Sequence, residues 1–310
     1  MFRKHICFAI VLICWFLWGE PAARGQSIQK HSSLYFISDC QQPVPGEKII
    51  FNINNNVVAR DTLFREIEKK DEGYVFMLGD LVGEGSKDKY WRDIDGFMNR
   101  LHTQGTIVYG IPGNHEYLMR ARHGINNYRK RFPDIPLTGY CVRTDSMAIV
   151  MLNSNFGKLT SDARKYQQQW YQAEMDSLDK DVSVKMVIVC THHSPYSNSK
   201  IVGSSGEVQE AFVPRFKSSP KTKLFLTGHS HNLECFDGSH GKRFLVIGGG
   251  GGFDQPLYTG DMEKHKDLIS QEIKPRFFYL VLQRDQNVLN VTIRGYSKEL
   301  LPVPEIKVSL

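Results

Sequence analysis

Short apolar runs alternate with amphipathic stretches along most of the chain, and this alternation limits the possible folds more than any other feature. The apolar runs predict strands at Leu34–Ser38, Tyr74–Leu78, Thr106–Gly110, Met147–Leu152, Lys185–Cys190, Leu224–Leu226 and Phe244–Ile247. Apolar residues spaced three and four apart predict helices at Val57–Lys69, Lys87–Leu101 and Ser161–Leu178. Strands that alternate with helices are typical of a layered α/β domain.

The alternation fades toward the C-terminus. There, Phe277–Leu282 and Val288–Ile293 predict a β-hairpin. The glycine run Gly248–Gly252 lacks the Lys-Ser/Thr pair and the helix pattern of a phosphate-binding loop, so we expect it to let the backbone pass close to another element. Because the chain has no internal repeat and no long linker, we predict a single domain over residues 30–300.

The first 25 residues have the pattern of a signal peptide. Arg3 and Lys4 precede thirteen apolar residues, Ile6–Trp18, a run shorter than the roughly 20 residues that span a bilayer. We therefore predict that residues 1–25 direct export and that the mature protein is secreted or periplasmic, with no membrane attachment after cleavage. The alternative is an uncleaved signal anchor, which would leave a membrane-tethered ectodomain.

The charge balance gives little support for a nucleic-acid partner. The whole chain has 39 Lys+Arg and 33 Asp+Glu, a net charge of +6. Removal of the predicted signal peptide takes away Arg3, Lys4, Arg24 and Glu20, which leaves 36 against 32, or +4. No dense Lys/Arg cluster lies on a predicted helix or strand, so we expect no nucleic-acid binding.

Four cysteines remain once the predicted signal peptide is removed: Cys40, Cys141, Cys190 and Cys235. An oxidising compartment permits disulfides, but no two of these residues have zinc-type CxxC spacing. A chain of this length can bury a core without cross-links, so we expect no essential disulfide.

Residues of metal-binding type follow five of the predicted strands. In chain order they are Asp39 with Gln41, Asp80, Asn114 with His115, His192 with His193, and His229 with His231. A single Gly-Asp or Asn-His pair is most often a plain loop. In an open α/β sheet, however, the loops at the carboxyl ends of the strands face one crevice, so the five blocks together predict a single site.

Carboxylate, amide oxygen and imidazole together suit divalent ions such as Mn, Fe or Zn, since this set requires no thiolate. An Asp placed between two such ions can bridge them. Two metals about 3.5–4 Å apart can clamp the attacking and leaving oxygens of a displacement at phosphorus and generate hydroxide near neutral pH.

These blocks, written as Asp39-x-Gln41, Gly79-Asp80, Gly113-Asn114-His115-Glu116, His192-His193 and Gly228-His229-x-His231, resemble the calcineurin-like metallophosphoesterase superfamily over residues 34–250. The resemblance implies a four-layer αββα sandwich and a site with two divalent metal ions. It implies that the first ion is held by Asp39, Asp80 and His231. It implies that Asp80 bridges to a second ion held by Asn114, His229 and either His192 or His193. His115 would bind no metal, and would stabilise the transition state or protonate the leaving oxygen.

Two positions are open. Gap-free alignment with the family's usual His-His-Pro-Pro favours His192 as the ligand, whereas the His-x-Pro spacing favours His193. Gln41 stands where most members have a His ligand. The purple acid phosphatase branch also lacks that His, but it has a Tyr at the position of Gly83 here and therefore fits poorly. Gln at this position is similar to the manganese-dependent ADP-ribose/CDP-alcohol diphosphatase branch. We therefore interpret Gln41 as a weak or outer ligand that favours Mn or Mg.

Three neighbouring features have less specific patterns. Asn153-Ser154-Asn155 could line a substrate pocket or form a plain loop, and Tyr196 could contact a leaving group or only pack. Cys40 should point away from its two neighbours if this segment is extended, because alternate residues of an extended chain face opposite sides.

The leading hypothesis is thus an exported enzyme that hydrolyses a phosphate ester or anhydride with a hydroxide bound by two metals. Its substrate would be a small-molecule phosphate ester or a nucleotide-like compound. The alternative is a catalytically weakened protein on the same fold that binds metal or phosphate, because Gln41 replaces the usual His ligand.

Overall fold

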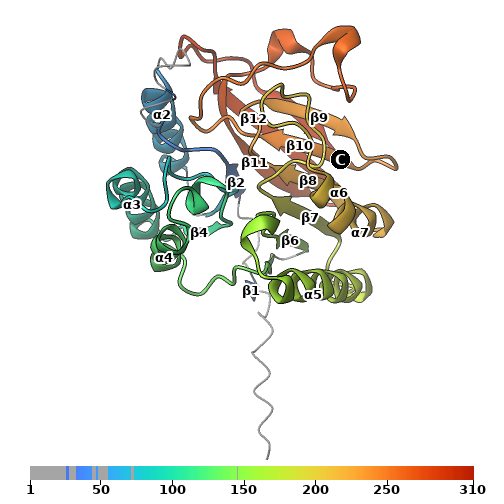
Figure 1. Ribbon diagram of the computed structural model, residues 1–310. Coiled ribbons are helices and arrows are strands. Elements are labelled where there is room, and N and C mark those ends of the chain that lie inside the picture. Colours follow the sequence, from blue (N-terminus) through green and yellow to red (C-terminus); the bar gives the residue numbers. More distant parts are fainter. Residues whose placement is uncertain (1–25, 28–32, 44–46, 48–54, 71–72, 145) are drawn as a thin grey trace, which may run out of the picture.

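A computed structural model describes residues 26–27, 33–43, 47, 55–70, 73–144 and 146–310. The predicted signal peptide, residues 1–25, lies outside the described residues. In the part of the chain that is described, no helix is both long and apolar enough to cross a membrane. Two β-sheets form the centre of the molecule, and the helices lie on either side of them (Figure 1).

The first sheet combines strands from both ends of the chain. Its order is β13 (Ile306–Ser309), β12 (Val288–Tyr296), β11 (Phe277–Asp285), β2 (Ser33–Ile37), β3 (Gly73–Met77) and β4 (Ile107–Gly110). Strands β2, β3 and β4 are parallel, whereas β11 is antiparallel to β2. Strands β11 and β12 pair up to Asp285 and Val288, which confirms the predicted hairpin.

The second sheet is formed mainly by the middle of the chain. Its order is β1 (Gln26–Ser27), β5 (Tyr140–Arg143), β6 (Met147–Met151), β7 (Met186–Thr191), β8 (Thr222–Thr227), β10 (Arg243–Ile247) and β9 (Leu233–Asp237). Strands β6, β7, β8 and β10 are parallel. The carboxyl ends of the parallel strands of each sheet therefore provide loops for a shared site.

Each sheet has its own layer of helices. The first is covered by α2 (Asn56–Glu68), α3 (Asp88–Thr103) and α4 (Ala121–Arg131), and the second by α5 (Ser161–Lys180), α6 (Gly206–Ala211) and α7 (Val213–Ser218). Short 3-10 turns lie at η1 (His115–Tyr117), η2 (Phe156–Lys158), η3 (Gly260–Met262) and η4 (Gln271–Ile273). The layers follow the order helix, sheet, sheet, helix, so the predicted αββα class is confirmed.

Alternation along the strands produces this layering. On β2, Leu34 and Phe36 pack between the two sheets, whereas Tyr35 and Ile37 pack against the helices. Phe36 and Phe76 stack with their ring centroids 4.7 Å apart. Successive strand side chains point to opposite faces, so buried apolar residues at every position are expected in a sheet that is covered on both sides.

Several elements were missing from the sequence prediction. Strands β5, β9 and β13 and helices α4, α6 and α7 were not predicted. Helix α4 carries few apolar residues, and it is held mainly by Ile125 and Tyr128, so its helical pattern is weak. Helices α6 and α7 have only six residues each, too short for a clear period.

Candidate metal centre

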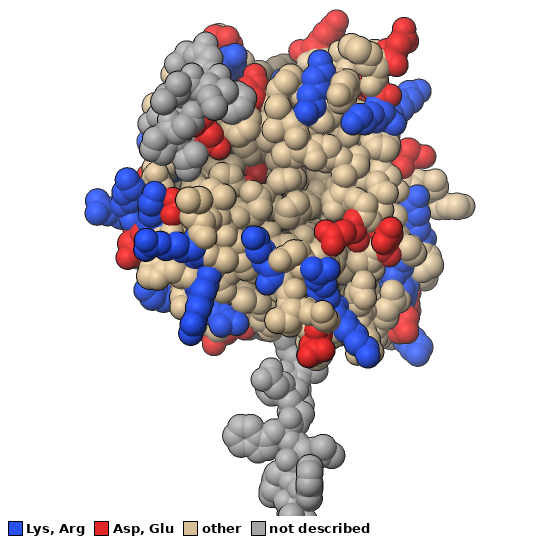
Figure 2. Space-filling view, viewed as in Figure 1, with Lys and Arg blue, Asp and Glu red and all other residues tan. Residues whose placement is uncertain are grey.

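The five polar blocks meet at the carboxyl ends of β2, β3, β4, β7 and β8. Contacts between the blocks cross from one sheet to the other: His192 Nδ1 donates to the carbonyl of Leu78, and the His229 amide donates to the Asp39 carboxylate. Figure 2 shows a hollow near the centre of this face, over the end of β2 in the same view. The site thus lies between the two halves of the sandwich, where the topology places the loops.

Three of the predicted ligands have left-handed backbone conformations. The φ angles are +60° at Asp39, +50° at Asp80 and +66° at His229. Such angles are uncommon outside glycine and are kept only where surrounding contacts hold them. Around Asp39, its amide donates to the Gly79 carbonyl and its carbonyl accepts the Gly252 amide, at 3.1 and 2.9 Å. These turns aim the side chains into the site at a cost in backbone energy.

Asp39, Gln41 and His231 form the first half of the site. Asp39 is fully buried, and its Oδ1 lies 3.4 Å from Nε2 of His231. The carboxamide of Gln41 forms hydrogen bonds in the orientation in which its nitrogen donates to the main-chain carbonyls of Asp39 and Asp80. Its oxygen then lies 3.0 Å from Nε2 of His231. Three potential metal-binding atoms therefore converge from one side.

The hydrogen bond of His231 Nδ1 shows that this nitrogen is protonated. Nδ1 lies 2.7 Å from the carbonyl of Phe253, and a carbonyl can only accept, so Nδ1 carries the proton. Nε2 then faces the oxygens of Asp39 and Gln41. A proton on Nε2 or a metal cation can join these atoms, and metal-ligating histidines commonly donate their other N–H to a carbonyl in this way.

Asp80, Asn114 and His192 form the second half. Asp80 is 1% exposed, its Oδ1 accepts the His115 amide, and its Oδ2 lies 3.3 Å from Nε2 of His192. The same Nε2 lies 3.1 Å from Oδ1 of Asn114. Asp80 therefore lies close to residues of both halves of the site.

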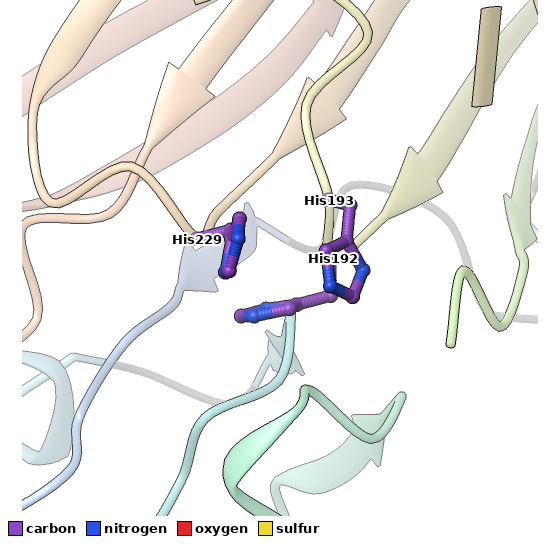
Figure 3. A group of neighbouring side chains, drawn as sticks. All are labelled: His192, His193 and His229. Carbon is purple, nitrogen blue, oxygen red and sulfur yellow. The ribbon is translucent and has the colours of Figure 1, made fainter. Parts of the chain in front are cut away.

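His192 and His193 lie in different surroundings. His192 is fully buried and faces both Asp80 and Asn114, whereas His193 Nδ1 lies 2.8 Å from the hydroxyl of Ser154. Figure 3 shows the rings of His192, His193 and His229 grouped together, with ring centroids 4.4–5.0 Å apart. The geometry favours His192 as the ligand beside Asp80 and places His193 next to it.

Electrostatics in the cluster favour a charged Asp80 carboxylate and a protonated His192 beside neutral His193 and His229. Burial opposes ionisation of Asp80, but His192 and His115 overcome it and hold the pKa of this carboxyl well below its usual range. Burial likewise acts against a charged His192, but Asp80 raises its pKa to about 9. Burial and the neighbouring imidazoles lower the pKa of His193 to about 3 and that of His229 well below its usual value. A neutral imidazole is the form that binds metal, so His192 would have to release its Nε2 proton on binding a cation.

His115 is placed differently from the predicted ligands. Its Nδ1 lies 2.6 Å from the Gly83 carbonyl, and its Nε2 is 3.9 Å from Oδ2 of Asp80. Burial lowers the pKa of His115, but the charge of Asp80 more than offsets this and raises it. Nδ1 donates to a main-chain carbonyl, so a proton on Nε2 requires the charged imidazolium, which the raised pKa of His115 favours.

Two overlapping groups of side chains in the site could hold a metal ion. Ligand atoms of Asp39, Asp80 and His192 all lie within 4.8 Å of one another, and so do those of His192, His193 and His229. The two groups share His192, and their atoms are carboxylate oxygens and imidazole nitrogens. This chemistry matches the expected preference for Mn, Fe or Zn.

Two supporting residues were not singled out from the sequence. Glu116 is fully buried and accepts the amides of Asp80, Leu81 and Gly113. Burial and the charge of Asp80 raise the pKa of Glu116 to about 7. The sequence could have pointed to Glu116, because this residue lies in the Gly113–Glu116 block directly after two predicted site residues. The second residue, Arg276, lies far along the chain from the blocks and had no sequence signal.

The loop Asn153–Asn155 supports the site through hydrogen bonds. The main chain of Asn153 pairs with the carboxamide of Gln167, and Asn155 Nδ2 donates to the carbonyl of Pro112, next to the Asn114 block. The hydroxyl of Ser154 accepts the amide of His193 and lies within hydrogen-bond distance of its Nδ1. These residues fix the ligand loops from behind.

Cys40 and the glycine run pack as expected. Cys40 is buried in the core between the first sheet and its helices, and burial raises the pKa of its thiol. A Cβ at Gly250 would overlap the main chain of Ser38, and one at Gly252 would overlap the ring of His231. Cys40, Cys141, Cys190 and Cys235 are all buried free thiols.

Comparison with known proteins gives the family. The calcineurin-like phosphoesterase model matches residues 32–233, which include every predicted ligand, so the chain belongs to this family and the predicted resemblance is confirmed. No curated protein matches the chain in sequence. The family explains why metal-ligand residues occur at the ends of five strands.

Solved structures share the fold at low identity. GAP50, the anchor in the inner membrane complex of Plasmodium, has a TM-score of 0.64 at 14% identity, with 90% of this chain and 89% of that chain covered. Purple acid phosphatase PPD1 from yellow lupin (Lupinus luteus) seeds has a TM-score of 0.66 at 15% identity. The match covers 93% of this chain but only 55% of the lupin chain. A dimetal phosphatase from Danio rerio has a TM-score of 0.53 at 16% identity, with 90% of this chain and 98% of that chain covered. These likenesses establish the fold alone.

The position of Gln41 generates a prediction about metal binding. Gln41→Ala should lower the affinity for Mn²⁺ about tenfold, because the variant removes an oxygen that faces Nε2 of His231. Equilibrium dialysis with metal analysis by mass spectrometry measures this affinity. Gln42→Ala is the matched control, because Gln42 bonds instead to Asp93 on α3. Unchanged metal content and affinity in Gln41→Ala would show that Gln41 is no ligand.

Proposed function

We propose that this protein is an exported metal-dependent phosphoesterase that uses two divalent cations to hydrolyse a small phosphate ester or anhydride. The observation that carries this proposal is the buried carboxylate of Asp80. Its ligand atom lies within 4.8 Å of those of Asp39, in the first half of the site, and His192, in the second. A carboxylate close to ligands of both halves is the arrangement that a bridged pair of cations requires.

The chain's own residues would hold the two cations in fixed places. Asp39, Asp80, Gln41 and His231 would hold the first, and Asp80, Asn114, His229 and His192 the second. When bound, the two ions would polarise the phosphoryl oxygens and lower the pKa of an attacking water. The buried ligands keep their orientation through main-chain contacts, so little reorganisation is required during the reaction.

His115 would act on the leaving group. Nδ1 is held by the carbonyl of Gly83, so the ring cannot turn freely, and Nε2 stays at the edge of the site. A proton on Nε2 can be donated to the leaving oxygen as the bond to phosphorus breaks. The same proton stabilises negative charge that develops on that oxygen.

A second candidate function is a metal- or phosphate-binding protein without efficient catalysis. Gln41 supports this candidate, because an uncharged oxygen binds a cation more weakly than the usual imidazole. The fold does not decide between the two functions, since a structure with the same fold is described as an anchor. The complete second half of the site and the position of His115 favour the enzyme.

Export rests on the sequence of residues 1–25. If the segment is cleaved, the mature chain should begin close to residue 26 and be found outside the cytoplasm. N-terminal sequencing of the protein recovered from the extracellular or periplasmic fraction tests this. A chain that still begins at Met1 in the membrane fraction would support the signal-anchor alternative.

The enzyme proposal predicts turnover that depends on added metal and on Asp80. The purified mature protein should hydrolyse a phosphomonoester, a phosphodiester or a nucleotide diphosphate when Mn²⁺, Zn²⁺, Fe²⁺ or Mg²⁺ is supplied. Asp80→Asn should abolish this turnover, because the amide has the same shape but lacks the bridging charge. Two metals bound per chain with no turnover on any substrate would instead support the binding-protein candidate.

The position of His115 predicts a dependence on the leaving group. His115→Asn should keep both metals but lower kcat about 100-fold for an alkyl phosphate, whose leaving oxygen needs a proton. The loss should be much smaller for a nitrophenyl phosphate, whose leaving group departs as an anion. His123→Asn, on the exposed side of α4, is the control. Equal losses on both substrates would contradict proton donation by His115.

A further inference from the structure

Arg276 brings a buried positive charge to the loop that carries His231. It lies directly before β11, and its side chain is 12% exposed. Nη2 donates to the carbonyl of Gly252 at 2.7 Å, and Nη1 donates to the carbonyl of His231 at 3.3 Å. Nε lies 3.3 Å from the carboxylate of Asp254, and burial lowers the pKa of the guanidinium. Two of the three guanidinium nitrogens of this buried cation thus donate hydrogen bonds to main-chain carbonyls.

The segment that Arg276 holds is the one that orients the His231 ring. Phe253 lies between Gly252 and Asp254, both of which Arg276 contacts, and its carbonyl accepts the Nδ1 proton of His231. The ring also rests directly on Gly252, where a Cβ would overlap it. The direction of the Phe253 carbonyl therefore decides which nitrogen of His231 faces Asp39.

Asn56 also holds the glycine part of this segment. Asn56 Nδ2 donates to the carbonyls of Gly251 and Gly252, at 2.9 and 2.6 Å. Asn56 contacts the glycine segment, whereas Arg276 contacts both that segment and the backbone of His231. Of these two residues, Arg276 is the one that bonds both to the main chain of His231 and to the segment that carries the acceptor of its ring.

We propose that Arg276 is a positioning residue for the first metal site, which holds His231 as the Nδ1–H tautomer with Nε2 directed at Asp39. Its side-chain polar partners in the described part of the chain are His231, Gly252 and Asp254, all on one side of the site. Asn114 and His192 follow other strands, so the second site should not depend on Arg276. The metal part of this proposal rests on the proposed function, whereas the tautomer part does not.

Metal affinities of Arg276→Met test the first part. The methionine keeps much of the apolar stem and removes all the donors. Mn²⁺ affinity at one site should fall about 10–100-fold, as for other residues that orient a metal ligand, while the other site changes less than about threefold. Arg284→Met, at the far end of β11, is the matched control and should keep both affinities.

Double variants show which site has changed. If Arg276 acts through His231, Arg276→Met should cause little further loss of affinity in a His231→Ala background. In an Asn114→Ala background its effect should be undiminished. Loss of both sites to the same extent, or full additivity with His231→Ala, would overturn the proposal.

The His231 tautomer provides a measurement that requires neither metal nor activity. In metal-free protein, ¹⁵N NMR of the imidazole should show the Nδ1–H form of His231, and Arg276→Met should show a mixture of tautomers. If that variant does not fold, Arg276→Lys keeps the charge with fewer donors and should give an intermediate result. An unchanged tautomer in the folded variants overturns the proposal. If the wild-type protein binds no metal, the proposed function fails while this measurement still decides the role of Arg276.

Discussion

The buried carboxylate of Asp80 is the charge on which the rest of the site depends. It lies 1% exposed at the end of β3, and burial alone would favour its neutral form. His192 and His115 keep it ionised, and one of its oxygens accepts a main-chain amide. A buried charge of this kind persists only when it is paired or binds a metal. The surrounding imidazoles, amides and left-handed turns can all be understood as the means of holding this charge in place.

The sandwich provides these partners because both sheets end at the same crevice. The loops after β2, β3 and β4 bring Asp39, Asp80 and Asn114 from one sheet, and the loops after β7 and β8 bring the histidines from the other. Contacts such as His229 to Asp39 then link the two sheets directly. Relative movement of the sheets would therefore change both halves of the site, so the packing of the inter-sheet core also positions the ligands.

Much of the fold could be predicted from the sequence, because the central strands are short apolar runs that end in polar blocks. The same blocks identified the residues that the structure brings together. Helix α4 and the edge strand β13 were missed because their buried faces are small. Arg276 could not be predicted, because it acts through main-chain carbonyls, which carry no sequence signal. The different surroundings of His192 and His193 likewise could not be predicted, since both spacings were compatible with the sequence.

The central claim is that Asp80 bridges two cations held by these loops. Anomalous diffraction from crystals grown with Mn²⁺ tests it most directly, because it locates each ion without reference to activity. The account predicts two peaks about 3.5–4 Å apart, both within coordination distance of the Asp80 carboxylate. A single peak, two peaks that do not share Asp80, or no peak at the ends of β2, β3, β4, β7 and β8 would contradict it.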